Sequence, residues 1–111
     1  MFHHRRLICY QRSLDAARRV PKLTARWPRG SYYLEDQLKR AVSSITLNIA
    51  EGNGRTSPKD RARFFGFARA SAAEASSIID VAGALNLVDK IDEEFFQDKF
   101  LQIVKMLYKL R

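Results

Sequence analysis

The sequence "NIAEGNGRTSPKD", Asn48 to Asp60, lies near the middle of the chain and decides how its two halves are connected. Its GxGR segment allows two interpretations, a phosphate-binding loop or a corner between two helices. A phosphate loop normally follows a strand and carries a Lys-Ser or Lys-Thr pair. Here the preceding residues have helical periodicity and that pair is missing. We therefore interpret the stretch as a helical corner and do not expect nucleotide binding.

The corner contains signals that end one helix and begin the next. Gly52 is expected to end the first of these helices in a left-handed conformation, with Asn53 and Gly54 forming the turn. Ser57 suits the cap position of the next helix, and Pro58 suits its first helical position. These signals predict a short connection between two neighbouring helices.

Helical periodicity continues over nearly the whole chain of 111 residues, and strand alternation is almost absent. We expect four helices, at residues 5–26, 33–52, 58–87 and 92–110. Pro21 should kink the first helix or separate its last turns. The pattern predicts an all-α protein, an antiparallel up-down four-helix bundle that forms one domain over residues 1–111.

Apolar residues that recur every three or four positions predict the buried face of each helix. In chain order these are Leu7, Tyr10, Leu14 and Ala17; Leu34, Leu38, Ala41, Ile45 and Ile49; Phe64, Ala68, Ala72, Ala75, Ile79, Ala82 and Leu85; and Phe96, Phe100, Ile103 and Leu107. The fourth helix carries a second apolar stripe, formed by Leu101, Val104 and Tyr108, that a monomer would leave exposed. We expect this stripe to be an oligomer interface.

The net charge of +8, with an isoelectric point near 10.1, exceeds what solubility requires. Four arginines on the first helix are spaced by seven residues, which places them on one stripe. With their neighbours they form the candidate nucleic-acid-binding set Arg5, Arg12, Arg18, Arg19, Lys22 and Arg26. The alternative is a solvated charged face. Because no recognition motif accompanies the stripe, any binding should involve the backbone of RNA or DNA, with little sequence preference.

A polar stripe follows the second helix beside its apolar one and consists of Gln37, Arg40, Ser44, Asn48 and Glu51. Two interpretations are open: Glu51 and Glu74 could pair as a metal-binding or acid-base site, or the stripe could form a hydrogen-bonded network in which Arg40 reaches Glu74. Metal-binding bundles need several carboxylates with a Glu-x-x-His pattern, which is missing here. We therefore favour a structural polar network of Gln37, Arg40, Asn48, Glu51 and Glu74.

The remaining reactive residues indicate no chemistry. His3 and His4 lie near the amino end and are expected to be exposed and unstructured. Cys9 is the single cysteine, and we expect it to be a buried, inert thiol. We expect no catalytic residue, cofactor or metal. The longest uncharged run, "AVSSITLNIA", is about half a membrane span, so we also expect a soluble, cytoplasmic protein without a membrane partner.

The segments "QLKRAVSSITLNIAEGNGRTS" and "FFGFARASAAE" resemble a known family. They are similar to four-helix-bundle proteins found within intervening sequences of bacterial 23S ribosomal RNA genes, which are related to the accessory variability protein of diversity-generating retroelements. The matching positions are Gln37, Leu38, Arg40, Ala41, Ser44, Ile45, Asn48, Ile49, Ala50, Glu51, Gly52, Gly54, Arg55 and Glu74. Two departures are Ala70, where many members have glycine, and Pro21 in the first helix.

The resemblance implies a four-helix bundle that often assembles as a five-membered ring and has no established enzymatic activity. It also implies possible partners, because retroelement relatives assist a reverse transcriptase and bind nucleic acid. The resulting hypothesis is a non-enzymatic homo-oligomer, with a pentamer as the expected number, whose basic surface binds RNA or DNA. The alternative hypothesis is a structural interaction module with an acidic protein partner and no affinity for nucleic acid.

Overall fold

The computed structural model describes residues 2–110, and residues 1 and 111 of the expected domain lie outside it. Helices account for all the regular structure of this part of the chain, which confirms the all-α class. In chain order they are η1 (His3–Arg6), α1 (Ile8–Thr24), η2 (Arg29–Ser31), α2 (Tyr32–Gly54), α3 (Pro58–Ala84) and α4 (Lys90–Lys109), where η denotes a short 3-10 helix.

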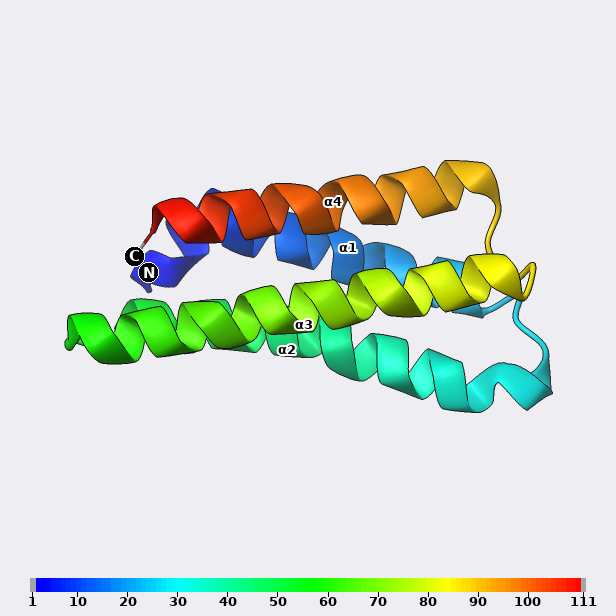
Figure 1. Ribbon diagram of the computed structural model, residues 1–111, viewed down its shortest axis with the longest axis horizontal. Coiled ribbons are helices and arrows are strands. Elements are labelled where there is room, and N and C mark those ends of the chain that lie inside the picture. The colour runs from blue at the N-terminus through cyan, green and yellow to red at the C-terminus, as the bar shows by residue number, and fades with distance from the viewer. Residues whose placement is uncertain (1, 111) are drawn as a thin grey trace.

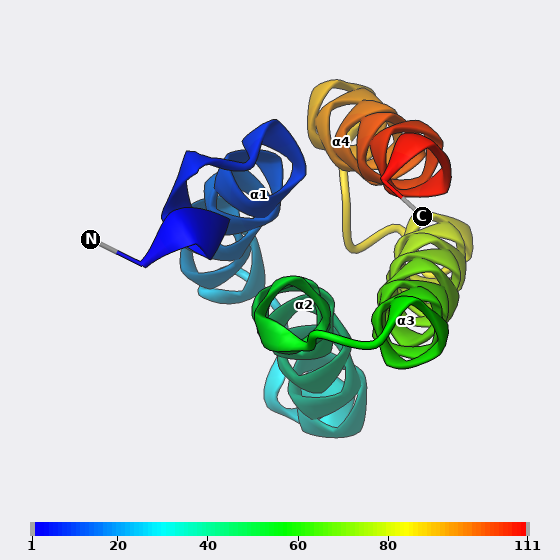
Figure 2. The same ribbon diagram turned by 90° about the vertical axis from the view of Figure 1, so that its left-hand side faces the viewer.

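The four long helices form an elongated bundle in which successive helices run in opposite directions (Figure 1). Each helix packs against the next, and α1 also packs against α4, which closes the bundle around one core (Figure 2). Both chain ends and the α2–α3 corner lie at one end of the bundle. The α1–α2 and α3–α4 connections lie at the other end.

The expected core faces of α2 and α4 are confirmed, because every residue assigned to them is buried. On α3 the prediction is wrong at both ends: Phe65, not Phe64, is fully buried, and Leu85 is exposed beyond the last turn. On α1 the buried face is displaced from the expected one and consists of Cys9, Ser13, Ala16, Val20, Leu23 and Thr24.

The displacement on α1 has a polar cause. Ser13 is fully buried at the centre of this face, and its hydroxyl lies 2.6 Å from the Tyr10 carbonyl oxygen and 2.8 Å from the Thr46 hydroxyl on α2. A buried hydroxyl is tolerated where it is hydrogen-bonded. A search for apolar residues alone therefore misses this helix face.

The boundaries of α1 also differ from expectation. Leu7 has an extended backbone, with φ −70° and ψ 130°, which separates η1 from α1. Pro21 does not split off the last turns, because α1 continues to Thr24. The amide of Ala25 donates to the Pro21 carbonyl over 3.0 Å, so the helical bonding pattern resumes after the proline.

The backbone conformation of Gly52 in the α2–α3 corner differs from the predicted left-handed one. None of the described glycines has a positive φ, and Gly52, Asn53 and Gly54 all belong to α2. A Cβ atom at Gly52 would lie 2.8 Å from two ring carbons of the buried Phe65. This glycine is therefore needed for close packing of α2 on α3.

The predicted start of α3 is confirmed: the Ser57 side chain accepts a hydrogen bond from the Asp60 amide over 3.3 Å, and Pro58 is the first helical residue. At its other end α3 stops at Ala84, three residues earlier than predicted. Asn86, with φ 60°, and Leu87 close the helix by donating their amides to the carbonyls of Gly83 and Ala82.

Candidate functional site

Three of the four evenly spaced arginines face α4: Arg12 and Arg19 lie on α1, and Arg26 lies two residues beyond its end. The guanidinium of Arg12 donates to the Gln102 side-chain oxygen over 3.1 Å. The guanidinium groups of Arg19 and Arg26 lie 3.2 Å and 3.1 Å from the two carboxylate oxygens of Asp92. A seven-residue spacing places side chains on one face of a helix. Here that face adjoins the neighbouring helix, so these arginines connect α1 to α4.

Asp92 is the centre of this connection. It is only 8% exposed, and both of its carboxylate oxygens are paired with arginine. The guanidinium of Arg19 also lies 4.5 Å from the centroid of the Phe95 ring. These contacts partly neutralise two arginines of the predicted phosphate-binding stripe.

The other three residues of the predicted set have more exposed positions. Arg5 is exposed on η1, Arg18 pairs with Asp15 over 3.1 Å, and Lys22 is exposed near the end of α1. Asp15, Arg18 and Lys22, together with Arg19, Phe95 and Lys99, line a shallow cavity of about 290 Å³. The six residues thus do not form one exposed stripe, and their contact with phosphate stays a prediction.

The net charge lies at one end of the bundle. We call the half made of residues 2–15, 44–70 and 100–110 the basic end, and the half made of residues 16–43 and 71–99 the balanced end. The basic end has ten Lys and Arg against three Asp and Glu, a net charge of +7, whereas the balanced end has nine of each. The cations of the basic end are Arg5, Arg6, Arg12, Arg55, Lys59, Arg61, Arg63, Arg69, Lys105 and Lys109.

Several of these cations lie beside aromatic rings at the start of α3. The Arg55 and Arg63 guanidinium groups lie 4.8 Å and 5.0 Å from the centroid of the Phe64 ring. Arg63 also lies 5.6 Å from the Phe67 ring centroid, and Lys59 is exposed one turn earlier on the same side of α3. The sequence interpretation missed this cluster. The signal was the segment "KDRARFFGF", in which basic and aromatic residues follow the corner directly.

The polar stripe on α2 does not form the expected network with Glu74. Arg40 pairs with Asp36 over 2.9 Å and Glu51 with Arg55 over 2.8 Å, both within the Tyr32–Arg55 segment. Gln37 and Glu74 are exposed.

The polar link between α2 and α3 is made by serines. The Ser44 and Ser71 hydroxyls lie 2.8 Å apart, and the side-chain amide of Asn48 donates to the Ser44 carbonyl oxygen over 2.8 Å. Two members of the predicted polar stripe, Ser44 and Asn48, therefore take part in this link.

The second apolar stripe of α4 is largely exposed in the single chain. Leu101 is 53% and Tyr108 51% exposed, and Val104 is half-buried. The Arg69 guanidinium lies 4.3 Å from the Tyr108 ring centroid. Beside Leu101 and Val104, a cavity of about 320 Å³ lies between α3 and α4, lined also by Ala72, Ala73, Ser76, Gln97 and Phe100.

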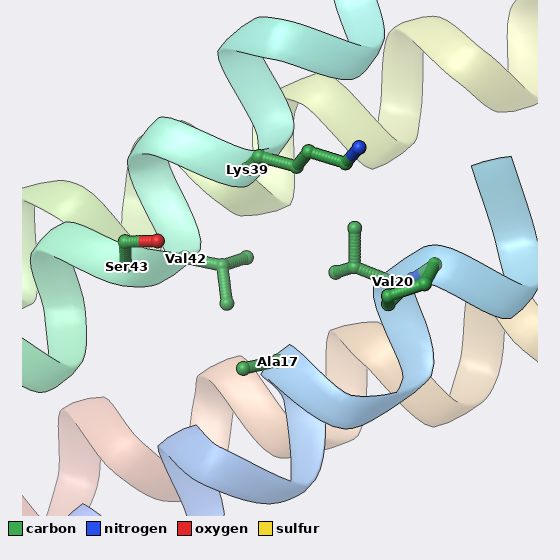
Figure 3. Close-up of a pocket in the computed structure, with 6 residues that line it drawn as sticks. Ala17, Val20, Lys39, Val42 and Ser43 are labelled. Carbon is green, nitrogen blue, oxygen red and sulfur yellow. The ribbon is translucent and has the colours of Figure 1, made fainter.

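A further cavity, of about 220 Å³, lies between α1 and α2. Figure 3 shows Val20 of α1 and Val42 of α2 pointing toward each other across it. Its polar lining consists of Ser43 and Lys39, and the Lys39 ammonium lies 3.5 Å from the Glu35 carboxylate. This lining contains no nucleophile paired with a base.

The two histidines are ordered, contrary to expectation. They belong to η1, where His3 Nδ1 lies 3.1 Å from the side-chain nitrogen of Asn53, and the His4 ring packs 4.9 Å from the Tyr10 ring. Cys9 is buried as predicted, and burial raises the pKa of its thiol. Among residues 2–110, no three His, Cys, Asp or Glu side chains are grouped closely enough to hold a metal ion.

Two comparisons with known proteins bear on this bundle. A family model described as "23S rRNA-intervening sequence protein" matches residues 5–109, nearly the whole chain. None of the curated proteins compared with the chain matches it. Within residues 2–110, none of the helices has the length and apolar character that a membrane crossing requires.

Proposed function

The chain belongs to the family of 23S rRNA-intervening sequence proteins, and from that premise we propose that it is a non-enzymatic bundle that binds the phosphate backbone of RNA or DNA through its basic end. The observation that carries this proposal is the net charge of +7 on one half of the bundle against zero on the other. A surface of one charge sign attracts a polyanion and orients it toward that end.

The binding surface that we propose differs from the arginine stripe on α1. Arg19 and Arg26 share the Asp92 carboxylate, so much of their charge is already compensated. Lys59, Arg63 and Lys105 are exposed cations of the basic end, where the few acids compensate little of the total charge. Because such contacts engage phosphates, binding should depend weakly on sequence and strongly on salt.

Self-association through α4 belongs to the same proposal. Leu101, Val104 and Tyr108 place apolar and aromatic surface outside the core, beside the cavity between α3 and α4. A second copy that covers this surface would remove it from water. We expect a closed ring, with five copies as the expected number. If the bundle axes follow the ring axis, cyclic symmetry gathers all the basic ends on one face, and their contacts add by avidity.

The assembly is tested by light scattering at micromolar protein concentration. Wild type should be a closed oligomer, and Leu101→Glu should shift it toward monomer because it places a charge in the interface. Lys109→Glu, at an exposed site on the same helix but farther from Leu101 around the helix axis, is the matched control and should leave the assembly unchanged. A monomeric wild type would contradict this part of the proposal.

Nucleic-acid binding is tested by measuring the affinity for several unrelated RNA and DNA oligonucleotides at a series of salt concentrations. We expect similar affinities for all sequences and a linear fall of log K with log salt. The competing function is contact with an acidic protein. Tighter binding to a polyglutamate peptide than to RNA of equal charge, or no RNA binding near physiological salt, would favour that alternative.

A further inference from the structure

The first turns of α3, within the basic end, present an aromatic side chain to solvent. The Phe67 side chain is 46% exposed, and its ring meets the ring of Phe64 edge-to-face, with centroids 5.7 Å apart. An exposed phenylalanine adds no charge, and leaving its apolar surface in water costs free energy. Its position therefore calls for an explanation other than phosphate binding.

Phe64 lies beside the close contact between α2 and α3. A Cβ atom at Gly52 would lie 3.1 Å from Phe64 Cβ and 2.8 Å from the ring of Phe65, so α2 and α3 are closely packed at this point. The Arg55 and Arg63 guanidinium groups lie over the Phe64 ring, and Arg63 also borders Phe67. The result is a pair of mutually perpendicular aromatic rings on α3 with cations beside them.

This combination fits one class of ligand, and the inference rests on the proposed function. We propose that the basic end binds single-stranded nucleic acid, with an unpaired base stacked on Phe67 and the adjoining phosphates on Lys59 and Arg63. Base–aromatic stacking adds affinity without sequence selection, because every base has a π face. A duplex keeps its base faces inside its own stack, so it can use the cations but not Phe67.

Exposed aromatic residues at the balanced end provide a contrast. Tyr32 and Tyr33 are exposed at the start of α2, where Glu35 and Asp36 follow within one turn. These carboxylates repel phosphate. We therefore expect no base stacking on an exposed ring that has carboxylates beside it, and Tyr33 serves as a control position.

The test uses two ligands, a single strand that forms no hairpin and a duplex of the same sequence and length. Each ligand is measured against wild type, Phe67→Leu, Phe67→Trp and Tyr33→Leu. Phe67→Leu keeps an apolar side chain but removes the π face. It should weaken single-strand binding about tenfold, as expected for one lost stacking contact, and leave duplex binding within about twofold. Phe67→Trp should retain single-strand binding, and Tyr33→Leu should change neither.

The outcomes separate this inference from the proposed function. If wild type binds no nucleic acid, both fail. If wild type binds single strand and duplex equally, and Phe67→Leu has no effect or weakens both equally, only the stacking inference fails. Light scattering on Phe67→Leu adds a second readout: a changed oligomeric state would place Phe67 in an interface between copies and would also overturn the inference.

Discussion

The two ends of the bundle carry nearly equal numbers of cations but differ in what surrounds them. At the balanced end nine Lys and Arg meet nine Asp and Glu, and Asp92 fixes Arg19 and Arg26 between α1 and α4. At the basic end ten cations meet three acids, and arginines such as Arg63 lie over aromatic rings at the surface. Arg19 and Arg26 therefore support the fold at the balanced end, whereas we propose that exposed cations of the basic end bind an external anion.

The difference shows that charge along a sequence is a poor guide to charge on a surface. Residues 1–63 carry a net charge of +9 and residues 64–111 a net charge of −1, and this distribution favours α1 as the binding surface. Folding brings acids of α4 beside the arginines of α1, and it brings η1, the α2–α3 corner and the last turns of α4 together at the other end. The distribution of charge on the surface depends on the folded arrangement and not on the order of the charges in the sequence.

The largest expected effect concerns the packing of the basic end. Gly52→Ala places a methyl group against the buried Phe65 ring, whereas the new Cβ at Gly54 lies within 4 Å of nothing beyond its chain neighbours and the backbone of its own helix. Overpacking typically costs about 1–3 kcal/mol. Gly52→Ala should lower the free energy of unfolding by that amount relative to Gly54→Ala, measured by urea denaturation followed by circular dichroism. Equal stabilities would mean that the corner is not closely packed.

The next effect concerns the balanced end. Asp92→Asn removes the charge that Arg19 and Arg26 share, and hydrogen bonds to charged groups are worth about 1.5–3 kcal/mol. Because both arginines are partly exposed, we expect a loss of only about 1–2 kcal/mol in the free energy of unfolding. Glu94→Gln, at an exposed position in the same helical turn, should cost less than about 0.5 kcal/mol. Similar losses for both variants would contradict the structural role of Asp92.

A smaller effect concerns Cys9, which lies in the core of the basic end. Burial raises the pKa of this thiol, although cations are abundant at the surface nearby. Labelling by a thiol reagent at pH 8 should be much slower in the folded protein than in urea, because the reactive thiolate is scarce and covered. The folded state holds this proton more tightly than the unfolded state does. The free energy of unfolding should therefore fall as the pH rises above about 8.5, the ordinary thiol pKa.

One outcome of the labelling experiment would contradict the burial of Cys9. Equal labelling rates in native buffer and in urea would mean that Cys9 is accessible in the folded protein. Cys9→Ala serves as the control for the pH dependence, because the variant should lose the part of the fall that comes from this thiol.

Much of the fold was predictable because local signals agreed with the final packing. The apolar stripes of α2 and α4 and the Ser57–Pro58 start of α3 need only helix periodicity and capping chemistry. The conformation of Gly52 was not predictable, because its role depends on the distance to Phe65 on another helix. The same limit applies to Ser13, which is buried by virtue of a hydroxyl partner on α2.

The candidate site was predictable only in part, for a related reason. The spacing of Arg12, Arg19 and Arg26 correctly indicated that these side chains share one direction, although Arg26 lies beyond the end of α1. Whether that direction meets solvent or α4 depends on tertiary packing. The cluster of Arg55, Arg63 and Phe67 joins residues on both sides of a corner and could be recognised only once the corner was placed.

The central claim, that nucleic acid binds at the basic end, is tested most directly by removing two exposed cations from each end in turn. The variants are Lys59→Gln/Arg63→Gln at the basic end and Lys22→Gln/Arg29→Gln at the balanced end, and the measurement is the slope of log K against log salt for one RNA. The basic-end variant should reduce the slope by about two per bound subunit, one for each lost phosphate contact, while the balanced-end variant keeps the wild-type slope. Equal slopes for the two variants, or a larger loss from the balanced end, would contradict the claim.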